Sequence, residues 1–323
     1  MPELTDPRLT LRRPTLADAE AILGVVNASD IADFGEADVE LADIVEDLTA
    51  MDLERDGWVV TSDEGMIATG VVLVHGQVQH RLMLYVVPDW RRRGIGSVLL
   101  GNLEARSAEL VAIAPDGARV VAQSWTKGDW EPGLAFARRH GYAVSRRFYR
   151  MTITMTEPPP APEWPDGATV RTFRPGVDER AVFEAVEEAF SDHWGHLPMD
   201  FDVWRRRFDR DDFDPSLWFL AMDGDQIAGT SLCSVIPGMG WVGSLSVRRA
   251  WRRRRLASAL LHHSFGVFWE RGHRTVGLGV DAGSLTGATR LYESVGMSVA
   301  EQYDQLEKEM RPGRDLAVRD LDA

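Results

Sequence analysis

One short stretch is written twice in this sequence, as Val87-Pro-Asp-Trp-Arg-Arg-Arg-Gly-Ile-Gly96 and as Val247-Arg-Arg-Ala-Trp-Arg-Arg-Arg-Arg-Leu-Ala257. In each copy an apolar run typical of a strand precedes the arginines, and an apolar run typical of a helix follows them. Other landmarks repeat in the same order, at separations from 155 residues (Gly141 to Gly296) to 161 residues (Trp90 to Trp251). This ordered repetition indicates a duplicated unit.

The duplication predicts two domains in the 323 residues, each long enough to bury its own core. We expect one domain over residues 7–156 and a second over residues 167–312. Between them, residues 157–166 include Glu157-Pro-Pro-Pro-Ala-Pro-Glu-Trp-Pro165, whose prolines favour a stiff linker. Residues 313–323 are polar and rich in turn formers, so they are expected to form a flexible tail.

Each half shows the same order of expected elements. A short strand is followed by an amphipathic helix (18–26 or 178–190), two strands joined by a tight turn, and a strand that enters the arginine-rich stretch. An apolar helix, another strand (119–123 or 275–280), a last helix and closing strands follow. The pattern predicts an α/β fold in which helices flank a twisted mixed sheet, used twice.

Composition narrows the class of protein. The net charge of −14 disfavours nucleic acid as a partner, since phosphate binding needs a basic surface. No apolar run reaches the roughly 20 residues of a membrane span, and the first residues lack the pattern of a secretion signal, so we expect a cytoplasmic protein. Cys233 is the only cysteine, which excludes an internal disulfide. The sequence contains neither paired cysteines nor a His-Glu-x-x-His motif, so we expect no metal site. Monomer and homodimer both remain possible.

The repeated turn has the features of a pyrophosphate site. Glycine lets the backbone approach an anion, and the free N–H groups at a helix start bind phosphate oxygens. Its spacing matches neither the nucleotide P-loop nor the dinucleotide fingerprint. The candidate residues are Arg91, Arg92, Arg93, Gly94, Ile95, Gly96 and Ser97 in the first copy, and Arg252, Arg253, Arg254, Arg255, Leu256, Ala257 and Ser258 in the second.

From about Leu9 to Met310 the sequence resembles the GCN5-related N-acetyltransferases. The turn is similar to that family's coenzyme A motif, and Leu291-Tyr292-Glu-Ser-Val-Gly-Met297 is similar to its last helix. The tandem layout, with Phe190-Ser-Asp-His-Trp-Gly195 near the start of the second half, resembles the mycothiol-synthase-like group. The resemblance implies acetyl-CoA as cofactor, a small-molecule amine as acceptor and Tyr292 as the acid that protonates the leaving thiolate. Main-chain contacts to the cofactor are implied for Val86 and Val87 and for Leu245, Ser246 and Val247.

The two halves depart from the family pattern in opposite ways. Counted back from Gly141, the first half has Ala137 where the second has Tyr292. The second half has Arg255 where the first has Gly94. Arginine there either blocks the turn conformation or adds a positive charge to the pyrophosphate site.

Glu188 and Asp192, at the end of the predicted helix in the second half, are candidates for deprotonating the amine, together with His193. The alternative is a polar loop that only caps the helix. The sequence therefore predicts an acetyl-CoA-dependent N-acetyltransferase with a catalytic second domain, and a first domain that binds CoA or regulates. A non-catalytic CoA sensor or scaffold is the alternative function.

Overall fold

The computed structural model describes residues 4–37, 39–210, 213–284 and 287–319, and these residues form two compact units. Unit 1 comprises residues 1–145 and 304–316, and unit 2 comprises residues 146–303 and 317–323. Both units are mixed α/β structures, as predicted. Within the described part of the chain, no helix is both long and apolar enough to cross a membrane.

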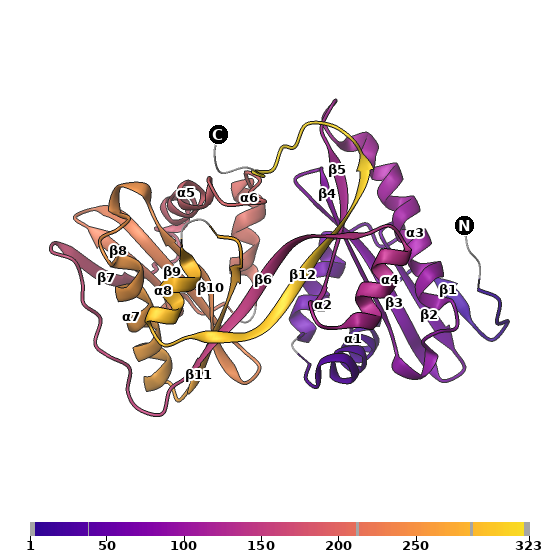
Figure 1. Cartoon of the computed structure of the whole chain (residues 1–323), viewed down its shortest axis with the longest axis horizontal. Coiled ribbons are helices and arrows are strands. Elements are labelled where there is room, and N and C mark those ends of the chain that lie inside the picture. Colours follow the sequence, from indigo (N-terminus) through magenta and orange to yellow (C-terminus); the bar gives the residue numbers. More distant parts are fainter. Residues whose placement is uncertain (1–3, 38, 211–212, 285–286, 320–323) are drawn as a thin grey trace. The chain divides into compact units, whose positions relative to one another are not determined.

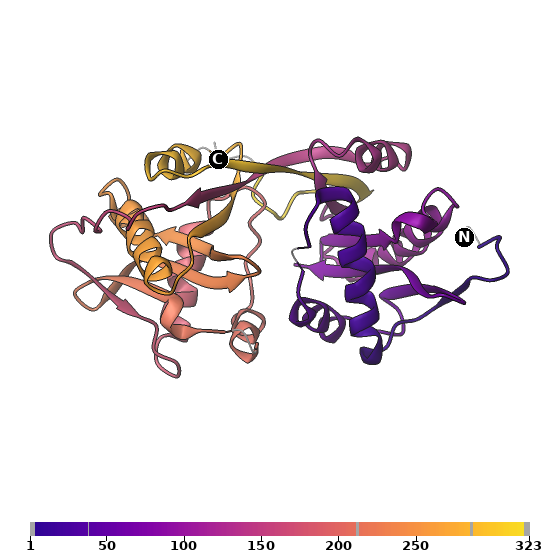
Figure 2. The ribbon, with the colours of Figure 1, turned by 90° about the horizontal axis from the view of Figure 1, so that it is seen from below.

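Unit 1 is built on a sheet with strand order β1-β2-β3-β4-β5-β12. Helix α1 lies across one face of these strands (Figure 2), and α3 packs on the other face through Leu99 and Leu103. The elements are β1 (Thr10–Arg12), α1 (Ala19–Phe34), α2 (Leu41–Ala50), β2 (Gly57–Ser62), β3 (Gly65–His75), β4 (Gln79–Val86), α3 (Ile95–Leu110), β5 (Val120–Lys127) and α4 (Glu131–Arg139), with β12 (Ser298–Arg311) entering from the end of the chain.

Unit 2 repeats the arrangement with strand order β7-β8-β9-β10-β11-β6. Helices α7 and α8 bury one face of the sheet around Phe265 and Phe268, and α5 buries the other face through Val182 and Ala185 (Figure 1). The elements are β6 (Ala143–Thr154), β7 (Ala168–Thr172), α5 (Glu179–Phe190), α6 (Phe201–Trp204), β8 (Trp218–Asp223), β9 (Gln226–Ile236), β10 (Met239–Val247), α7 (Leu256–Glu270), β11 (Thr275–Asp281) and α8 (Ala288–Ser294).

A repeated ion pair supports the duplication inferred from the sequence. In unit 1, Arg12 at the end of β1 donates to both carboxylate oxygens of Asp18, which lies just before α1. In unit 2, Arg171 on β7 does the same to Asp178 before α5. Each pair joins the first strand to the first helix, so the same ion pair holds the same two elements together in both copies.

The last strands of the two sequence halves are exchanged between the units. Strand β6 belongs by sequence to the first half, yet residues 148–154 pair antiparallel with 275–281 of β11 in unit 2. Strand β12 ends the second half, yet its residues from 304 onward belong to unit 1, where β12 follows β5. The compact units therefore differ from the predicted domains 7–156 and 167–312. The sequence half that encodes a strand does not decide which sheet it joins, because the strand pairs with the sheet edge that accepts its hydrogen bonds.

The predicted linker and tail are both in contact with folded elements. Trp164 of the linker packs against the unit-2 core, 5.9 Å between ring centroids from His263. In the tail, Val318 accepts a hydrogen bond from the Gly195 N–H (2.6 Å) and donates one to the His196 carbonyl (3.1 Å). The described residues of 313–319 are therefore bound to the units, and residues 320–323 lie outside the described part.

Candidate active site

Both arginine-rich turns have the same backbone conformation. Gly94 precedes α3 with φ +84°, and Arg255 precedes α7 with φ +63°, both left-handed; Arg92 and Arg253 share a φ of +63°. No side chain among the described residues caps either helix. The first N–H groups of α3 and α7 are thus left for an anion. Of the two possibilities for Arg255, the turn conformation is kept, at a cost of about 1–2 kcal/mol for an L-residue in this region.

The first arginine of each turn forms hydrogen bonds to other residues of its own unit. Arg91 donates to Asp33 on α1 (2.9 Å) and to the Val86 carbonyl (2.9 Å). Arg252 donates to Asp192 beyond α5 (2.8 Å) and to the Val247 carbonyl (3.3 Å). These two side chains fix the turn against the preceding helix. The exposed side chains of Arg92, Arg93, Arg253, Arg254 and Arg255 remain as the candidates for contacting phosphate.

In each unit the two central parallel strands separate from each other beside the arginine-rich turn. In unit 1, β4 pairs with β5 only over residues 79–81, and in unit 2, β10 pairs with β11 only over residues 240–242. Beyond these points the predicted cofactor contacts Val86 and Leu245–Val247 lie on strands without a parallel partner. Both segments are paired with an antiparallel strand on their other side, so only alternate backbone N–H groups are directed toward the gap, which suits an extended amide chain such as pantetheine.

The gap in unit 2 has a feature that unit 1 lacks in its described residues. The register between β9 and β10 shifts between Val242 and Ser244, which marks a bulge at Gly243, whereas β3 and β4 pair without a shift. A bulge turns the following backbone groups away from the regular ladder. Glycine inside the predicted strand 241–247 was the available sequence signal for it.

The sheet face toward α5 is open next to this bulge. Gly279 of β11 is exposed, and an added Cβ would meet no atom within 4 Å. By strand alternation, Trp125 of β5 lies on the corresponding face in unit 1. Unit 2 therefore has room for an acceptor beside the strand gap, at a level where unit 1 carries an indole ring.

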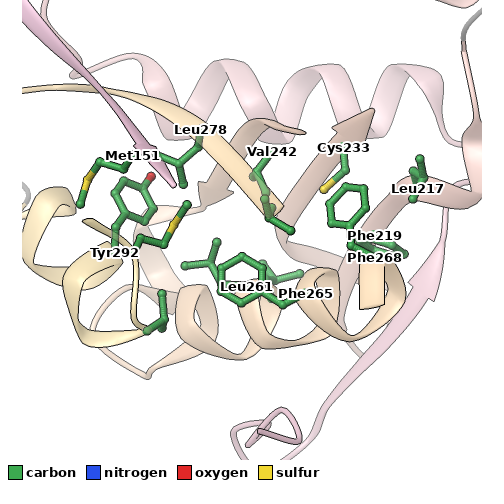
Figure 3. Packing of buried hydrophobic residues seen from close by; sticks show 14 of the residues in the cluster. Met151, Leu217, Phe219, Cys233, Val242, Leu261, Phe265, Phe268, Leu278 and Tyr292 are labelled. Carbon is green, nitrogen blue, oxygen red and sulfur yellow. The ribbon is translucent and has the colours of Figure 1, made fainter. Parts of the chain in front are cut away.

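Tyr292 lies on α8 with its ring beside Met151 and Leu278 (Figure 3). Burial raises the pKa of its phenol to about 12. The hydroxyl makes no hydrogen bond to any described residue, which leaves it able to donate a proton to a ligand. The buried Ala137 on α4 is its counterpart in unit 1.

Both carboxylates that were predicted to deprotonate the amine form ion pairs with arginines. Glu188 accepts from Arg248 (2.6 Å), and Asp192 accepts from Arg252. The hydrogen bond from Arg252 lowers the pKa of Asp192, and burial lowers the pKa of His193. A carboxylate stabilised in its charged form is a weaker base. The structure thus favours the loop-capping interpretation for Glu188 and Asp192.

The sequence profile of the acetyltransferase (GNAT) family matches residues 180–297, and that of a GNAT acetyltransferase domain matches residues 54–144. A mycothiol acetyltransferase of Geodermatophilus obscurus is 32% identical over 67% of this chain and 69% of its own length. One of Thermobispora bispora is 32% identical over 67% and 71%. The chain belongs to the GNAT family.

Solved GNAT structures share the tandem arrangement. A GCN5-related N-acetyltransferase from Sphaerobacter thermophilus is 41% identical, with a TM-score of 0.81 over 96% of this chain and 98% of its own. A tandem GNAT protein from the clavulanic acid biosynthesis pathway, 18% identical, has a TM-score of 0.70 over 95% and 100%. The chain is therefore an N-acetyltransferase of tandem, mycothiol-synthase-like type.

The cofactor of a GNAT enzyme is acetyl-CoA, and the residues of unit 2 fit it. The uncapped start of α7 suits the pyrophosphate, and the gap between β10 and β11 suits the pantetheine chain. The Ser244 hydroxyl at the bulge is buried without a hydrogen-bond partner among the described residues. Such a group is explained when a ligand supplies the missing partner.

Proposed function

We propose that this enzyme transfers an acetyl group from acetyl-CoA to the primary amine of a small molecule, and that unit 2 performs the transfer. The observation that carries the proposal is that unit 2 combines the bulge at Gly243, the open face at Gly279 and Tyr292. The relatives named mycothiol acetyltransferases support a small-molecule acceptor.

Each part of the unit-2 site has a separate task in this reaction. When bound, acetyl-CoA supplies a thioester, whose C–S bond breaks as the amine nitrogen forms a bond to the acyl carbon. Those backbone N–H groups of residues 244–247 that are directed away from β9 hold the carbonyl oxygen and stabilise its developing charge. The Tyr292 hydroxyl gives its proton to the departing sulfur, and its raised pKa keeps that proton in place at neutral pH. The attacking group is the neutral amine, whose nitrogen loses one proton as the amide forms, and this proton restores the Tyr292 hydroxyl, so that the products are the amide and the free thiol of CoA.

Unit 1 has a binding role in this proposal. It keeps the turn with Gly94 and the strand gap, so it retains the features that suit CoA. It has Ala137 in place of the tyrosine and regular pairing in place of the bulge. We propose that unit 1 binds CoA without transferring the acetyl group.

A pair of charge variants tests the assignment. Ala257→Glu places a carboxylate in the α7 turn, and Gly96→Glu does the same at the matching position of α3. Thiol release from acetyl-CoA is measured with glucosamine, spermidine, tyramine and S-methylcysteine as acceptors. We expect Ala257→Glu to abolish turnover and Gly96→Glu to retain it, and the reverse pattern would refute the assignment.

A third variant tests the acid. Tyr292→Phe should lower kcat by a factor of about 10²–10⁴, because the thiolate then leaves without a proton donor. The dissociation constant for acetyl-CoA, measured by calorimetric titration, should stay within about twofold, since the ring and its packing are kept. An unchanged kcat would remove Tyr292 from the mechanism.

A further inference from the structure

His193 lies in the loop that follows α5, and both of its neighbours in the chain are fixed at the ends of the central strands. Asp192, just before it, accepts a hydrogen bond from Arg252 (2.8 Å). Arg252 also donates to the carbonyl of Val247, at the end of β10 (3.3 Å). This side of the loop is therefore attached to the end of β10.

Trp194, just after His193, attaches the other side of the loop to the end of β11. Its ring centroid is 5.0 Å from the guanidinium of Arg146, which donates to both carboxylate oxygens of Asp281 (2.8 and 2.7 Å). The ring also lies 6.5 Å from that of Phe148, the residue of β6 that pairs with Asp281. Since its neighbours are held at β10 and β11, His193 lies above the gap between these two strands.

The loop and the open space over Gly279 are on the same face of the sheet. Leu278 and Val280 of β11 pack into the core under α7, so by alternation Gly279 and Asp281 face α5. Gly279 lies two residues before Asp281, a distance of about 7 Å along the strand. An amine placed over Gly279 is therefore within reach of the His193 imidazole above the same gap.

The imidazole of His193 can accept a proton at neutral pH. The half-buried ring packs against Phe190, 4.5 Å between centroids, and neither ring nitrogen makes a hydrogen bond to another described residue. Burial lowers the pKa of the imidazole, so the ring is neutral at pH 7 and has one unprotonated nitrogen. The charged and titratable groups that also act on this pKa are Arg252 and His196, which lower it, and Asp192 and Asp281, which raise it.

The carboxylates around the same gap are less suited to this task. Each accepts a hydrogen bond from an arginine, at 2.6 Å for Glu188, 2.8 Å for Asp192 and 2.7 Å for Asp281. These arginines stabilise the charged form of the carboxylates and so make them weaker bases. The imidazole of His193 has no such partner among the described residues, so its nitrogen is open to a ligand.

We propose that His193 is the general base of the transfer, which takes a proton from the ammonium group of an acceptor bound over Gly279. The inference rests on the proposed catalytic role of unit 2. An alkyl amine is protonated at neutral pH and in that form has no electron pair for attack. One N–H bond of the ammonium breaks, its proton moves to the imidazole nitrogen, and the electron pair stays on the amine. The imidazolium then releases the proton to water.

The pH profile of the wild-type enzyme tests for a base in the protein. We measure kcat/KM for the best amine of the four-member panel between the pKa of His193 and that of the amine. With His193 as base the acceptor reacts from its ammonium form, so kcat/KM should be constant over this range. An enzyme without a base uses only the neutral fraction of the amine, and its kcat/KM rises about tenfold per pH unit. Such a rise in the wild type would overturn the inference.

His193→Gln in the full-length protein identifies the base. At pH 7 we expect kcat/KM for the acceptor to fall at least about 100-fold. The constant region should be replaced by the tenfold rise per pH unit, so that the loss becomes smaller at higher pH. The acetyl-CoA dissociation constant should change less than about twofold. A loss of the same size at every pH would indicate a structural role and would overturn the inference.

His196→Gln is the matched control in the same loop. His196 is three residues beyond His193, and its Nε2 lies 3.6 Å from the Glu187 carboxylate. The same chemical change there should leave kcat/KM within about twofold of the wild type at every pH. An equal, pH-dependent loss in both variants would show that the effect comes from the loop and would refute the role of His193.

The outcomes distinguish this inference from the proposed function. If Ala257→Glu abolishes turnover while His193→Gln keeps the constant kcat/KM, unit 2 remains catalytic and His193 is not the base. If the wild type acetylates none of the four amines, the proposed function fails, and the NMR signal of the His193 ring in the CoA-saturated protein decides. A signal that shifts when an amine is added supports a place in the acceptor site, and an unchanged signal overturns it.

Discussion

Gly279→Val tests whether the acceptor binds on the α5 face of unit 2. An added Cβ would meet nothing within 4 Å, and the backbone is extended, so the valine side chain has room. Replacing glycine by a β-branched residue in a strand should stabilise the fold by up to about 1 kcal/mol. The new methyl groups, however, occupy the space assigned to the amine. We expect kcat/KM for the acceptor to fall at least about 100-fold, equivalent to about 2.7 kcal/mol.

Gly277→Val is the comparison on the same strand and face. A Cβ there would lie 2.9 Å from the Trp241 ring and 3.0 Å from the Met239 sulfur, so valine overpacks the sheet. That change should cost about 1–3 kcal/mol of unfolding free energy. Urea titration measures stability, and acetyl-CoA binding checks the cofactor site. A Gly279→Val enzyme with full kcat/KM would refute the placement of the acceptor.

Three more predictions concern stability. His80 is fully buried, and burial lowers the pKa of its imidazole to about 4. Below pH 6.5 the folded state therefore binds fewer protons than the unfolded chain, so the free energy of unfolding should fall by about 3 kcal/mol between pH 6.5 and pH 4. Urea titrations of the His80→Gln variant should not show this pH-dependent loss. Arg255→Gly removes the left-handed strain before α7 and should raise stability by about 1 kcal/mol, measured the same way, whereas Gly94→Ala should lower it by a similar amount. Removing residues 317–323 deletes both backbone hydrogen bonds between Val318 and the loop at Gly195, so residues 193–196 should exchange amide hydrogen faster; unchanged exchange would contradict a bound tail.

Local features of the fold follow from the sequence because they depend on neighbouring residues. The turn before each long helix and the short first strand both repeat at similar spacing in the two halves. The strand exchange could not be predicted in this way. The order of the elements predicts closing strands in each half, but it does not show which sheet edge accepts each of them.

In the candidate site, too, the features within one contiguous motif could be predicted, and the contacts between distant segments could not. The sequence located the turns and singled out Tyr292, since both lie in contiguous motifs. It did not indicate that Arg252 would bind Asp192, because 60 residues separate the two and only the fold brings them together. Gly279 carried a local signal, being a glycine inside an apolar strand.

The exchange of β6 and β12 also affects the order in which the protein can fold during synthesis. Strand β5 ends at Lys127, but the part of β12 that completes its sheet begins at Asp304, which is 177 residues later (304 − 127). At roughly 5–20 residues per second, the ribosome needs about 9–35 s to make that segment. During this interval the edge of β5 has no strand beside it and can pair with other chains. Unit 1 is encoded first, yet it is completed only when almost the whole chain has been made.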